Sequence, residues 1–471
     1  MVFSSIPFLF FFLPLCFILY YAVPFSLKNG ILLVFSLIFY AWGEPVYILL
    51  MLFATFVDYT NGRLMERFGD TRAKRTFFLC CSVVINLSVL AFFKYADFMI
   101  VNINELFRCN IAPLGLGLPV GISFFTFQSM SYIIDLYRGE VETERNYATY
   151  LTYVSMFPQL VAGPIVRFSD IQSELHRRTI TRTRVEDGIL RFMQGLFKKV
   201  LIANQVGALW EQIRVIEASQ ISVMMAWIGA VCFTLQLYFD FSAYSDMAIG
   251  IGHMLGFTFN ENFNYPLSAI SVTDFWRRWH ISLSTWFRDY VYIPLGGNRK
   301  GGAKHLRNIA IVWFLTGLWH GAAWNFVIWG VYYGILLALE KYVWGKKLAK
   351  MPKIVQHLYT ILIVVFGFVI FTFDDMGALG VYLSSMFGIA GNPLFGQEIL
   401  WYLGNNSVVL LVACILAFPV YPWLKKKLDI VGKKTIIFTS AISMAGYVML
   451  FLLATACMVS DTYNPFLYFR F

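Results

Sequence analysis

The run N-I-A-I-V-W-F-L-T-G-L-W-H-G-A-A-W-N-F-V-I-W-G-V-Y-Y-G-I-L-L-A-L-E (308–340) decides the fold class. It contains no Lys, Arg or Asp, and its single Glu is the last residue. About 20 apolar residues suffice for a helix to cross a bilayer. The run is therefore a membrane segment, and because it exceeds one crossing we expect a kinked helix, a re-entrant segment or a pair of half-helices.

Apolar runs on both sides of this segment extend the same pattern over most of the chain. Several are interrupted: Gly43-Glu44-Pro45 breaks the run at 30–59, and Pro119 and Gly121 open the run at 119–136. Membranes tolerate such breaks where neighbouring helices or a cavity satisfy the freed backbone groups. The sequence thus predicts an all-α polytopic membrane protein with about ten to twelve tilted or broken transmembrane helices.

The composition excludes other classes of protein. Of the 471 residues 59% are hydrophobic and only 14% are charged, which argues against a soluble, fibrous or disordered chain. Lys and Arg exceed Asp and Glu by 37 to 27, and in a membrane chain this excess sets topology, so we expect no nucleic-acid partner. The seven Cys form no C-x-x-C pair, and we expect no metal site. One membrane domain over 1–471 is the simplest organisation.

The basic residues also predict which loops face the cytoplasm. Because cytoplasmic loops carry an excess of Lys and Arg, we expect the loop at 374–406, which has neither, to be external. The segments predicted to be cytoplasmic are 61–75, 138–146, 163–199, 260–307, 341–353 and 425–434.

The densest polar and aromatic stretch is S-V-T-D-F-W-R-R-W-H-I-S-L-S-T-W-F-R-D-Y (271–290). Ser271 followed three residues later by Asp274 is typical of a capping box and predicts a helix from Asp274 to about Tyr290. Residues four apart lie on one face of a helix, and that face would carry Trp276, His280 and Ser284.

The same stretch carries three cations: Arg277, Arg278 and Arg288. One interpretation is an aromatic, basic helix lying in the cytoplasmic interface of the membrane. The other is a cytosolic mouth that attracts an anionic, phosphate-bearing donor. Both remain open at this point.

His320 lies inside the run that decides the fold. On a continuous helix Thr316 and Trp324 would lie one turn away on either side of it. A titratable group inside a membrane segment is a functional candidate by default, and a neutral imidazole, which burial favours, is a suitable general base. The structural alternative is a neutral histidine that is hydrogen-bonded across a helix interface.

Other polar side chains lie within apolar runs, including Asp240 and Asp246. A carboxylate at the bilayer centre costs about 2.5–3.5 kcal/mol, so each should face a partner or a water-filled cavity. Structural hydrogen-bond networks and substrate contacts both fit this pattern. The candidate substrate- or donor-binding residues are Trp276, Arg277, Arg278, Arg288, Trp324, Asn325 and a helical stripe of Gln128, Tyr132 and Asp135.

Two motifs resemble the membrane-bound O-acyltransferase family in its bacterial polysaccharide-modifying branch. They are W-R-R-W-H-I-S-L-S-T-W-F-R-D-Y-V-Y-I-P-L-G-G (276–297) and W-H-G-A-A-W-N-F (319–326). The segments M-F-P-Q-L-V-A-G-P-I-V-R (156–167) and D-F-S-A-Y-S-D-M-A-I-G (240–250) are similar to the membrane subunit of alginate O-acetylation. The similarity extends over nearly the whole chain.

This resemblance implies a ring of helices around a central tunnel in the cytoplasmic (inner) membrane. An acetyl group from acetyl-coenzyme A or another cytosolic acyl thioester, which can be an acyl carrier protein, would pass to an extracytoplasmic polysaccharide. The family's principal catalytic histidine corresponds to His320 and its second functional position to His280. The resemblance implies no permanently bound cofactor, and it implies a separate extracytoplasmic acetyltransferase of the SGNH type as partner.

Two alternatives remain from the sequence. Within the family, the chain is also similar to the proteins that transfer D-alanine to teichoic acids from a carrier protein. In another class, broken helices and intramembrane carboxylates are typical of a transporter without covalent chemistry, although no internal inverted repeat is apparent.

Overall fold

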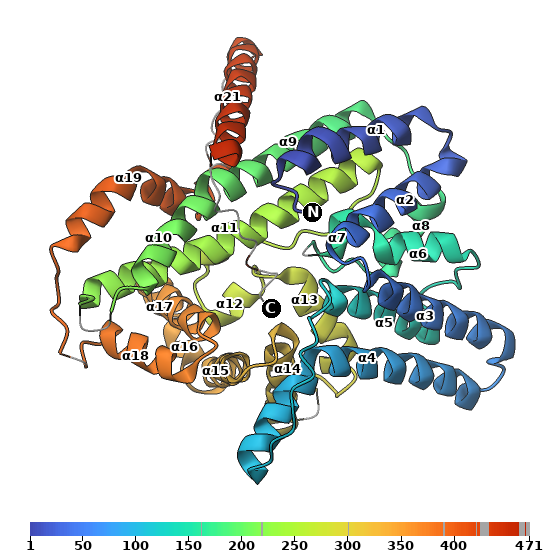
Figure 1. Cartoon of the computed structure of the whole chain (residues 1–471), viewed down its shortest axis with the longest axis horizontal. Coiled ribbons are helices and arrows are strands. Elements are labelled where there is room, and N and C mark those ends of the chain that lie inside the picture. The colour runs from blue at the N-terminus through green and yellow to red at the C-terminus, as the bar shows by residue number, and fades with distance from the viewer. Residues whose placement is uncertain are drawn as a thin grey trace. The chain divides into compact units, whose positions relative to one another are not determined.

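The structure is a computed structural model that describes residues 1–161, 163–217, 220–299, 301–389, 391–420, 422–423, 433–460 and 467. Within these ranges it consists of helices and loops without a strand, which confirms the all-α prediction (Figure 1). Most of the basic segment 425–434 lies outside the described residues.

The described chain packs as two compact units. The first comprises Met1–Phe192 and Ser245–Glu261, and the second comprises Met193–Tyr244 and Asn262–Phe471. Two helices, α9 (Arg182–Phe197) and α11 (Val223–Leu255), contribute residues to both units. The single domain over 1–471 stays a prediction.

The first unit combines long helices with short ones. Its α-helices are α1 (Leu13–Ala22), α2 (Phe25–Gly43), α3 (Ile48–Phe68), α4 (Arg72–Phe107), α5 (Ile122–Arg138), α6 (Tyr147–Ser155), α7 (Phe157–Leu160) and α8 (Phe168–His176), preceded by the π-helix η1 (Phe8–Phe12). The break that Gly43-Glu44-Pro45 predicts separates α2 from α3. At the start of α5, Gly121 has a φ of 76°, and a Cβ there would lie 2.8 Å from the backbone oxygen of Leu160. The glycine is therefore required by both conformation and space.

The second unit contains the two histidine motifs. Its α-helices are α10 (Asn204–Arg214), α12 (Val272–Trp276), α13 (Ile281–Phe287), α14 (Gly302–His320), α15 (Trp324–Leu339), α16 (Gly345–Leu348), α17 (Lys353–Thr372), α18 (Met376–Met386), α19 (Glu398–Leu416) and α21 (Lys433–Ser460). The shorter turns are η2 (Lys198–Ala203), η3 (Pro266–Ser268), η4 (Arg288–Tyr292) and η5 (Glu340–Trp344).

Helices α14 and α15 form an antiparallel hairpin, and α15 also packs against α17 (Figure 1). Gly317 of α14 meets Gly330 of α15 so closely that a Cβ on either would lie 2.4 Å from a backbone oxygen of the other helix. At the open end of the hairpin, the His305 Nδ1 and the Tyr342 hydroxyl are 2.5 Å apart. The long run 308–340 is therefore two helices that enter and return, as its length predicts.

Seven described helical segments are long and apolar enough to cross a membrane. They are Phe25–Gly43, Arg72–Phe107, Val223–Leu255, Trp324–Leu348, Lys353–Thr372, Glu398–Leu416 and Ser443–Ser460. Two shorter apolar helical segments, Phe8–Ala22 and Met376–Met386, accompany them. Among the described residues the candidate spans are thus fewer than the ten to twelve helices that the sequence predicts.

Candidate active site

The stretch 271–290 does not form the continuous helix that its sequence predicts. The N-terminal cap is confirmed, because the Ser271 hydroxyl accepts the backbone N–H of Asp274 at 3.0 Å. The predicted continuation is wrong: α12 ends at Trp276, and His280 adopts the left-handed region with a φ of 47°. Trp276, His280 and Ser284 therefore do not share a helical face.

The break has a tertiary cause. The backbone oxygen of Asn262 accepts the N–H of Ile281 at 3.0 Å, and the N–H of Asn264 donates to the oxygen of Arg278 at 2.9 Å. In a continuous helix the backbone oxygen of Arg278 and the N–H of Ile281 would be bonded within the helix. The extended segment 262–264 takes these bonds instead and holds the turn before α13.

His280 is buried in this turn, with 1% of its surface exposed. Its Nδ1 lies 3.2 Å from the Oδ1 of Asn262. The imidazole packs edge-to-face on Phe241, with ring centroids 4.7 Å apart, and on Trp319 at 5.8 Å. Nothing in the sequence motifs pointed to Asn262, which lies 18 residues away and is recognisable only from the fold.

His320 is the last residue of α14 and is 7% exposed. Its ring contacts those of Trp319, Trp329 and Phe371 at centroid distances of 5.0, 5.0 and 5.2 Å. Trp319 thus touches both imidazoles. The two histidines predicted from the sequence therefore contact the same indole ring.

The helix ends after His320, where Gly321 is extended with a φ of −170°, and a ring leaves no room for a side chain at 321. A Cβ at Gly321 would lie 2.1 Å from the ring of Phe326. Trp324 consequently begins α15 and does not lie one turn further along α14, so that expectation is wrong. Its side chain is 52% exposed and does not line the cavity described next.

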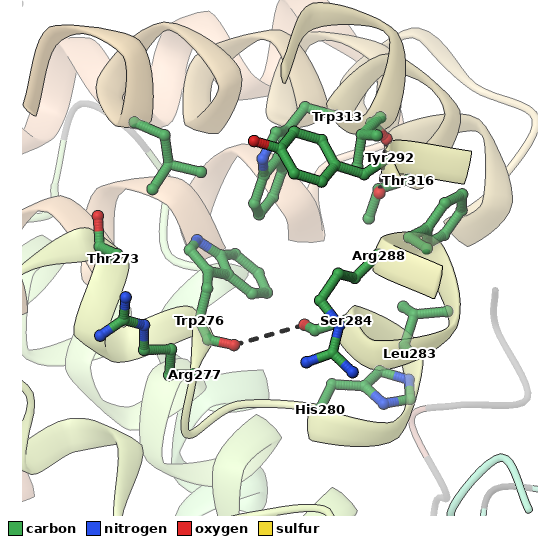
Figure 2. A pocket seen from close by; sticks show the side chains of 13 residues that line it. Thr273, Trp276, Arg277, His280, Leu283, Ser284, Arg288, Tyr292, Trp313 and Thr316 are labelled. Atoms are coloured by element: carbon green, nitrogen blue, oxygen red, sulfur yellow. Dashed lines mark hydrogen bonds between the residues drawn. The ribbon is translucent and has the colours of Figure 1, made fainter. Parts of the chain in front are cut away.

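A cavity of about 210 Å³ lies beside His280 (Figure 2). Thr316, one turn before His320 on α14, also lines it, whereas His320 itself does not. Its remaining lining residues are Thr273, Trp276, Arg277, Leu283, Ser284, Phe287, Arg288, Tyr292, Val312, Trp313 and Leu337. Four predicted site residues, Trp276, Arg277, His280 and Arg288, are therefore brought together.

The three arginines of the motif differ in their partners. The Nε of Arg278 donates to Asp274 at 2.9 Å, and Arg288 makes two bonds to Asp289 at 2.7 and 3.1 Å. Arg277 is exposed and makes no ion pair with a described residue. Only Arg277 offers the cavity a guanidinium without an acidic neighbour of its own.

The stretch that contains His280 runs alongside the membrane-spanning helix α17. Ala269 accepts a hydrogen bond from His357 near the start of α17 at 3.0 Å, whereas Trp279 packs on Phe368 near its end at 5.0 Å. At 1.5 Å per residue these two levels are about 17 Å apart. The expectation that all of 260–307 forms a cytoplasmic loop is therefore wrong, because its aromatic residues insert among the helices.

A second, more open cavity of about 410 Å³ adjoins the first and shares Thr273 with it. Lys341 and Lys346 line it, together with Glu340. The carboxylate of Glu340 is occupied, since it accepts the N–H groups of Val272 and Thr273 at 2.8 and 3.0 Å. From the sequence, the basic segment 341–353 predicts only a cytoplasmic loop. Nothing in the sequence indicates that its lysines lie near the cavity beside His280.

The other predicted residues have structural partners. The Nδ2 of Asn325 donates to the oxygen of Phe371 at 2.9 Å and so ties the start of α15 to the end of α17. Asp240 forms an ion pair with Lys199 at 2.6 Å, and both are at least 97% buried. These contacts agree with the expectation that buried polar groups in apolar runs face a partner.

The stripe on α5 belongs to the first unit. The hydroxyl of Tyr132 accepts the N–H of Glu144 at 3.1 Å, and Ser169 donates to Asp135 at 3.4 Å. Gln128 is fully buried, and neither its amide nitrogen nor its amide oxygen bonds to a described residue. Of the three, Gln128 has free hydrogen-bonding capacity for a ligand.

Comparison with known proteins identifies what the chain is similar to. The model of the membrane-bound O-acyltransferase family matches residues 42–384. The chain is 38% identical to the probable alginate O-acetylase of Pseudomonas putida over the full length of both proteins. It is 34% identical to the peptidoglycan O-acetyltransferase of Helicobacter pylori, over 84% of this chain and 81% of that protein. It is 28% identical to the teichoic acid D-alanyltransferase of Bacillus subtilis, over 54% of this chain and 68% of that protein.

Proposed function

Because the chain belongs to the membrane-bound O-acyltransferase family and is a multi-pass membrane O-acyltransferase, we propose that it serves the O-acetylation of an extracytoplasmic polysaccharide. It takes the acetyl group from a cytosolic thioester and passes it through the cytoplasmic membrane. Relatives named as O-acetylating enzymes match more of the chain, and at higher identity, than the D-alanyltransferase does. This difference favours acetyl transfer over transfer of D-alanine.

The observation that carries the proposal is the small cavity beside His280. Its volume of about 210 Å³ is below the roughly 300–1,000 Å³ of pockets for drug-sized ligands, which suits a small acetyl thioester end. Trp276 and Trp313 both line it and pack edge-to-face on each other, with ring centroids 4.7 Å apart. Large, rigid indole rings therefore limit its size.

The second cavity provides the approach for the donor. A coenzyme A thioester has a phosphate-bearing end and a long neutral arm that ends in the thioester. Lys341 and Lys346 suit the phosphates as point charges, and Thr273 lies between that cavity and the one beside His280. A carrier protein with a phosphopantetheine arm would use the same route for its arm.

In the transfer step a base removes the proton of an acceptor hydroxyl, whose oxygen attacks the thioester carbonyl. The new C–O bond forms, the C–S bond breaks, and the proton passes to the leaving thiolate. We assign the base to His320 and a role on the donor side to His280, which lines the donor cavity. The aromatic surroundings of His320 exclude water, which protects the thioester from hydrolysis.

The polysaccharide and the protein that completes the transfer belong to the same proposal. The acceptor hydroxyl is presented by an extracytoplasmic acetyltransferase of the SGNH type, which then modifies the sugar. Membrane lipid surrounds the exposed apolar faces of the candidate spans.

The test is acetyl-coenzyme A consumption by the purified protein in lipid nanodiscs, measured as release of the free thiol together with transfer of labelled acetyl to an added acceptor. We expect release that requires acceptor and is lost in His320→Ala. A protein that moves solute across vesicles but consumes neither acetyl-coenzyme A nor an acetylated carrier would be a transporter. Consumption of D-alanyl carrier alone would favour the teichoic acid branch.

A further inference from the structure

We propose that Asn262 is a positioning residue that holds the ring of His280 as the Nδ1–H tautomer, so that Nε2 offers a lone pair at the donor cavity. The inference rests on the proposed function, in which His280 serves the donor side. Asn262 is fully buried and lies outside both histidine motifs.

The direction of the hydrogen bond follows from a third residue. The backbone N–H of Ser282 donates to the Oδ1 of Asn262 at 3.2 Å, and the Ser282 hydroxyl lies 2.9 Å from the same atom. A backbone N–H can only donate, so the atom at this position is the amide oxygen and cannot be the amide nitrogen. The Nδ1 of His280, 3.2 Å from that oxygen, must then carry the proton.

The other ring nitrogen is left as an acceptor. In a neutral imidazole with its proton on Nδ1, Nε2 has only a lone pair. The Nε2 atom of His280 is buried and bonds to no described residue. An unused buried acceptor on a residue that lines the cavity is suited to a donor group of the substrate, such as an amide N–H of the pantetheine arm.

The neighbours of the ring favour its neutral form. Phe241 and Trp319 pack on it, and the charged groups that line the same cavity are Arg277 and Arg288. Nearby cations and burial both disfavour an imidazolium. The Nε2 atom therefore acts as an acceptor and does not donate to the thioester carbonyl.

Asn262 also maintains the backbone on which this geometry depends. His280 has a φ of 47°, a conformation that is costly for a residue other than glycine. The backbone oxygen of Asn262 holds Ile281, and its side chain holds Ser282. One residue thus fixes both the strained turn and the tautomer.

The experiment compares Asn262→Leu and Asn262→Asp with Ser282→Ala. The leucine keeps the volume but removes the acceptor, so we expect it to act as the loss of His280 does and to raise the donor KM about 10- to 100-fold, as when a partner that orients a histidine is lost. The aspartate keeps an acceptor oxygen and adds a charge that favours the imidazolium. In Asn262→Asp the acid limb of the pH profile of kcat/KM should therefore move to higher pH. Ser282→Ala keeps the bond between Asn262 and His280 and should stay near wild type.

A spectroscopic reading separates this role from simple folding. In protein labelled with ¹⁵N-histidine, the resonances lost in His280→Gln identify that ring, and we expect one protonated and one unprotonated nitrogen, with the proton on Nδ1. A proton on Nε2 in the wild type, or an unchanged donor KM and pH profile in folded Asn262→Leu, overturns the inference and leaves the proposed function intact. If His280→Gln is itself fully active, the donor-side role of His280 fails first.

Discussion

The indole ring of Trp319 contacts the imidazoles of both His280 and His320, with ring centroids 5.8 and 5.0 Å away. The first histidine comes from the turn between α12 and α13 and the second from the tip of the α14–α15 hairpin. Because both imidazoles pack on one rigid side chain, the two histidines belong to a single aromatic cluster.

Loss of His320 should abolish most of the turnover. General-base catalysis is typically worth about 10²- to 10⁴-fold, and we expect His320→Ala to lower kcat by at least that range. His280→Ala should cost less or act mainly on the donor KM. Polymer O-acetylation in cells and thiol release in vitro provide the two measurements. The control is His305→Ala, a histidine on the same helix that contacts Tyr342 instead. Turnover within a few-fold of wild type in well-expressed His320→Ala would show that His320 is a structural histidine.

A smaller side chain at 313 should relax the choice of acyl group. Trp313→Leu removes one of the two indoles that limit the donor cavity, so propionyl- and butyryl-coenzyme A should gain kcat/KM relative to the acetyl donor. Each buried CH₂ contributes about 0.8 kcal/mol, or roughly fourfold. Trp324→Leu, half exposed and outside the cavity, is the matched control. An unchanged preference in folded Trp313→Leu would mean that other residues set acyl length.

Removal of the two cavity lysines should weaken donors that carry the nucleotide. We expect Lys341→Gln with Lys346→Gln to raise the KM for acetyl-coenzyme A about tenfold, since each charge-assisted bond is worth about 1.5–3 kcal/mol before solvent screening. The KM for acetyl-pantetheine, which has no phosphate, should not change. Lys347→Gln with Lys350→Gln removes the same charge from the same segment outside the cavity. If both double variants raised the KM for acetyl-coenzyme A equally, the lysines would attract the donor by their general charge and not through a site in the cavity.

Replacement of Arg277 and replacement of Arg278 should have unequal effects on the donor KM. Arg277→Gln removes the guanidinium that has no acidic partner and should raise the donor KM, whereas Arg278→Gln mainly breaks a bridge to Asp274. Exposed pairs of this kind contribute little, about 0–1 kcal/mol. Steady-state kinetics of the two single variants test the difference. The reverse order would move the phosphate contact to Arg278.

Much of the fold could be predicted from the sequence, because membrane helices are read from apolar length alone. The break at Gly43-Glu44-Pro45 and the paired helices within 308–340 follow from residues that are adjacent in the chain. The catalytic candidates His280 and His320 came from short motifs, and their placement on one indole agrees with a shared site. Their roles stay predictions.

The errors arose where distant segments override local preference. The cap at Ser271 predicts a helix correctly, but nothing near it in sequence reveals that Asn262 and Asn264 will take the backbone bonds at 278 and 281. Likewise, the basic residues around 277 predict a cytoplasmic loop, whereas the contact between Trp279 and Phe368 shows an inserted one. Pairings of this kind depend on the assembled structure.

The α14–α15 hairpin also has a consequence for the lipid around the enzyme. From Gly302 to His320 the helix rises about 27 Å at 1.5 Å per residue, close to the ~30 Å hydrocarbon core of a typical bilayer. The glycine contact between its helices makes it stiff, so it cannot shorten or lengthen to follow the membrane. A change in bilayer thickness would therefore shift the depth of His320 in the membrane, so we expect turnover to depend on the acyl-chain length of the lipid.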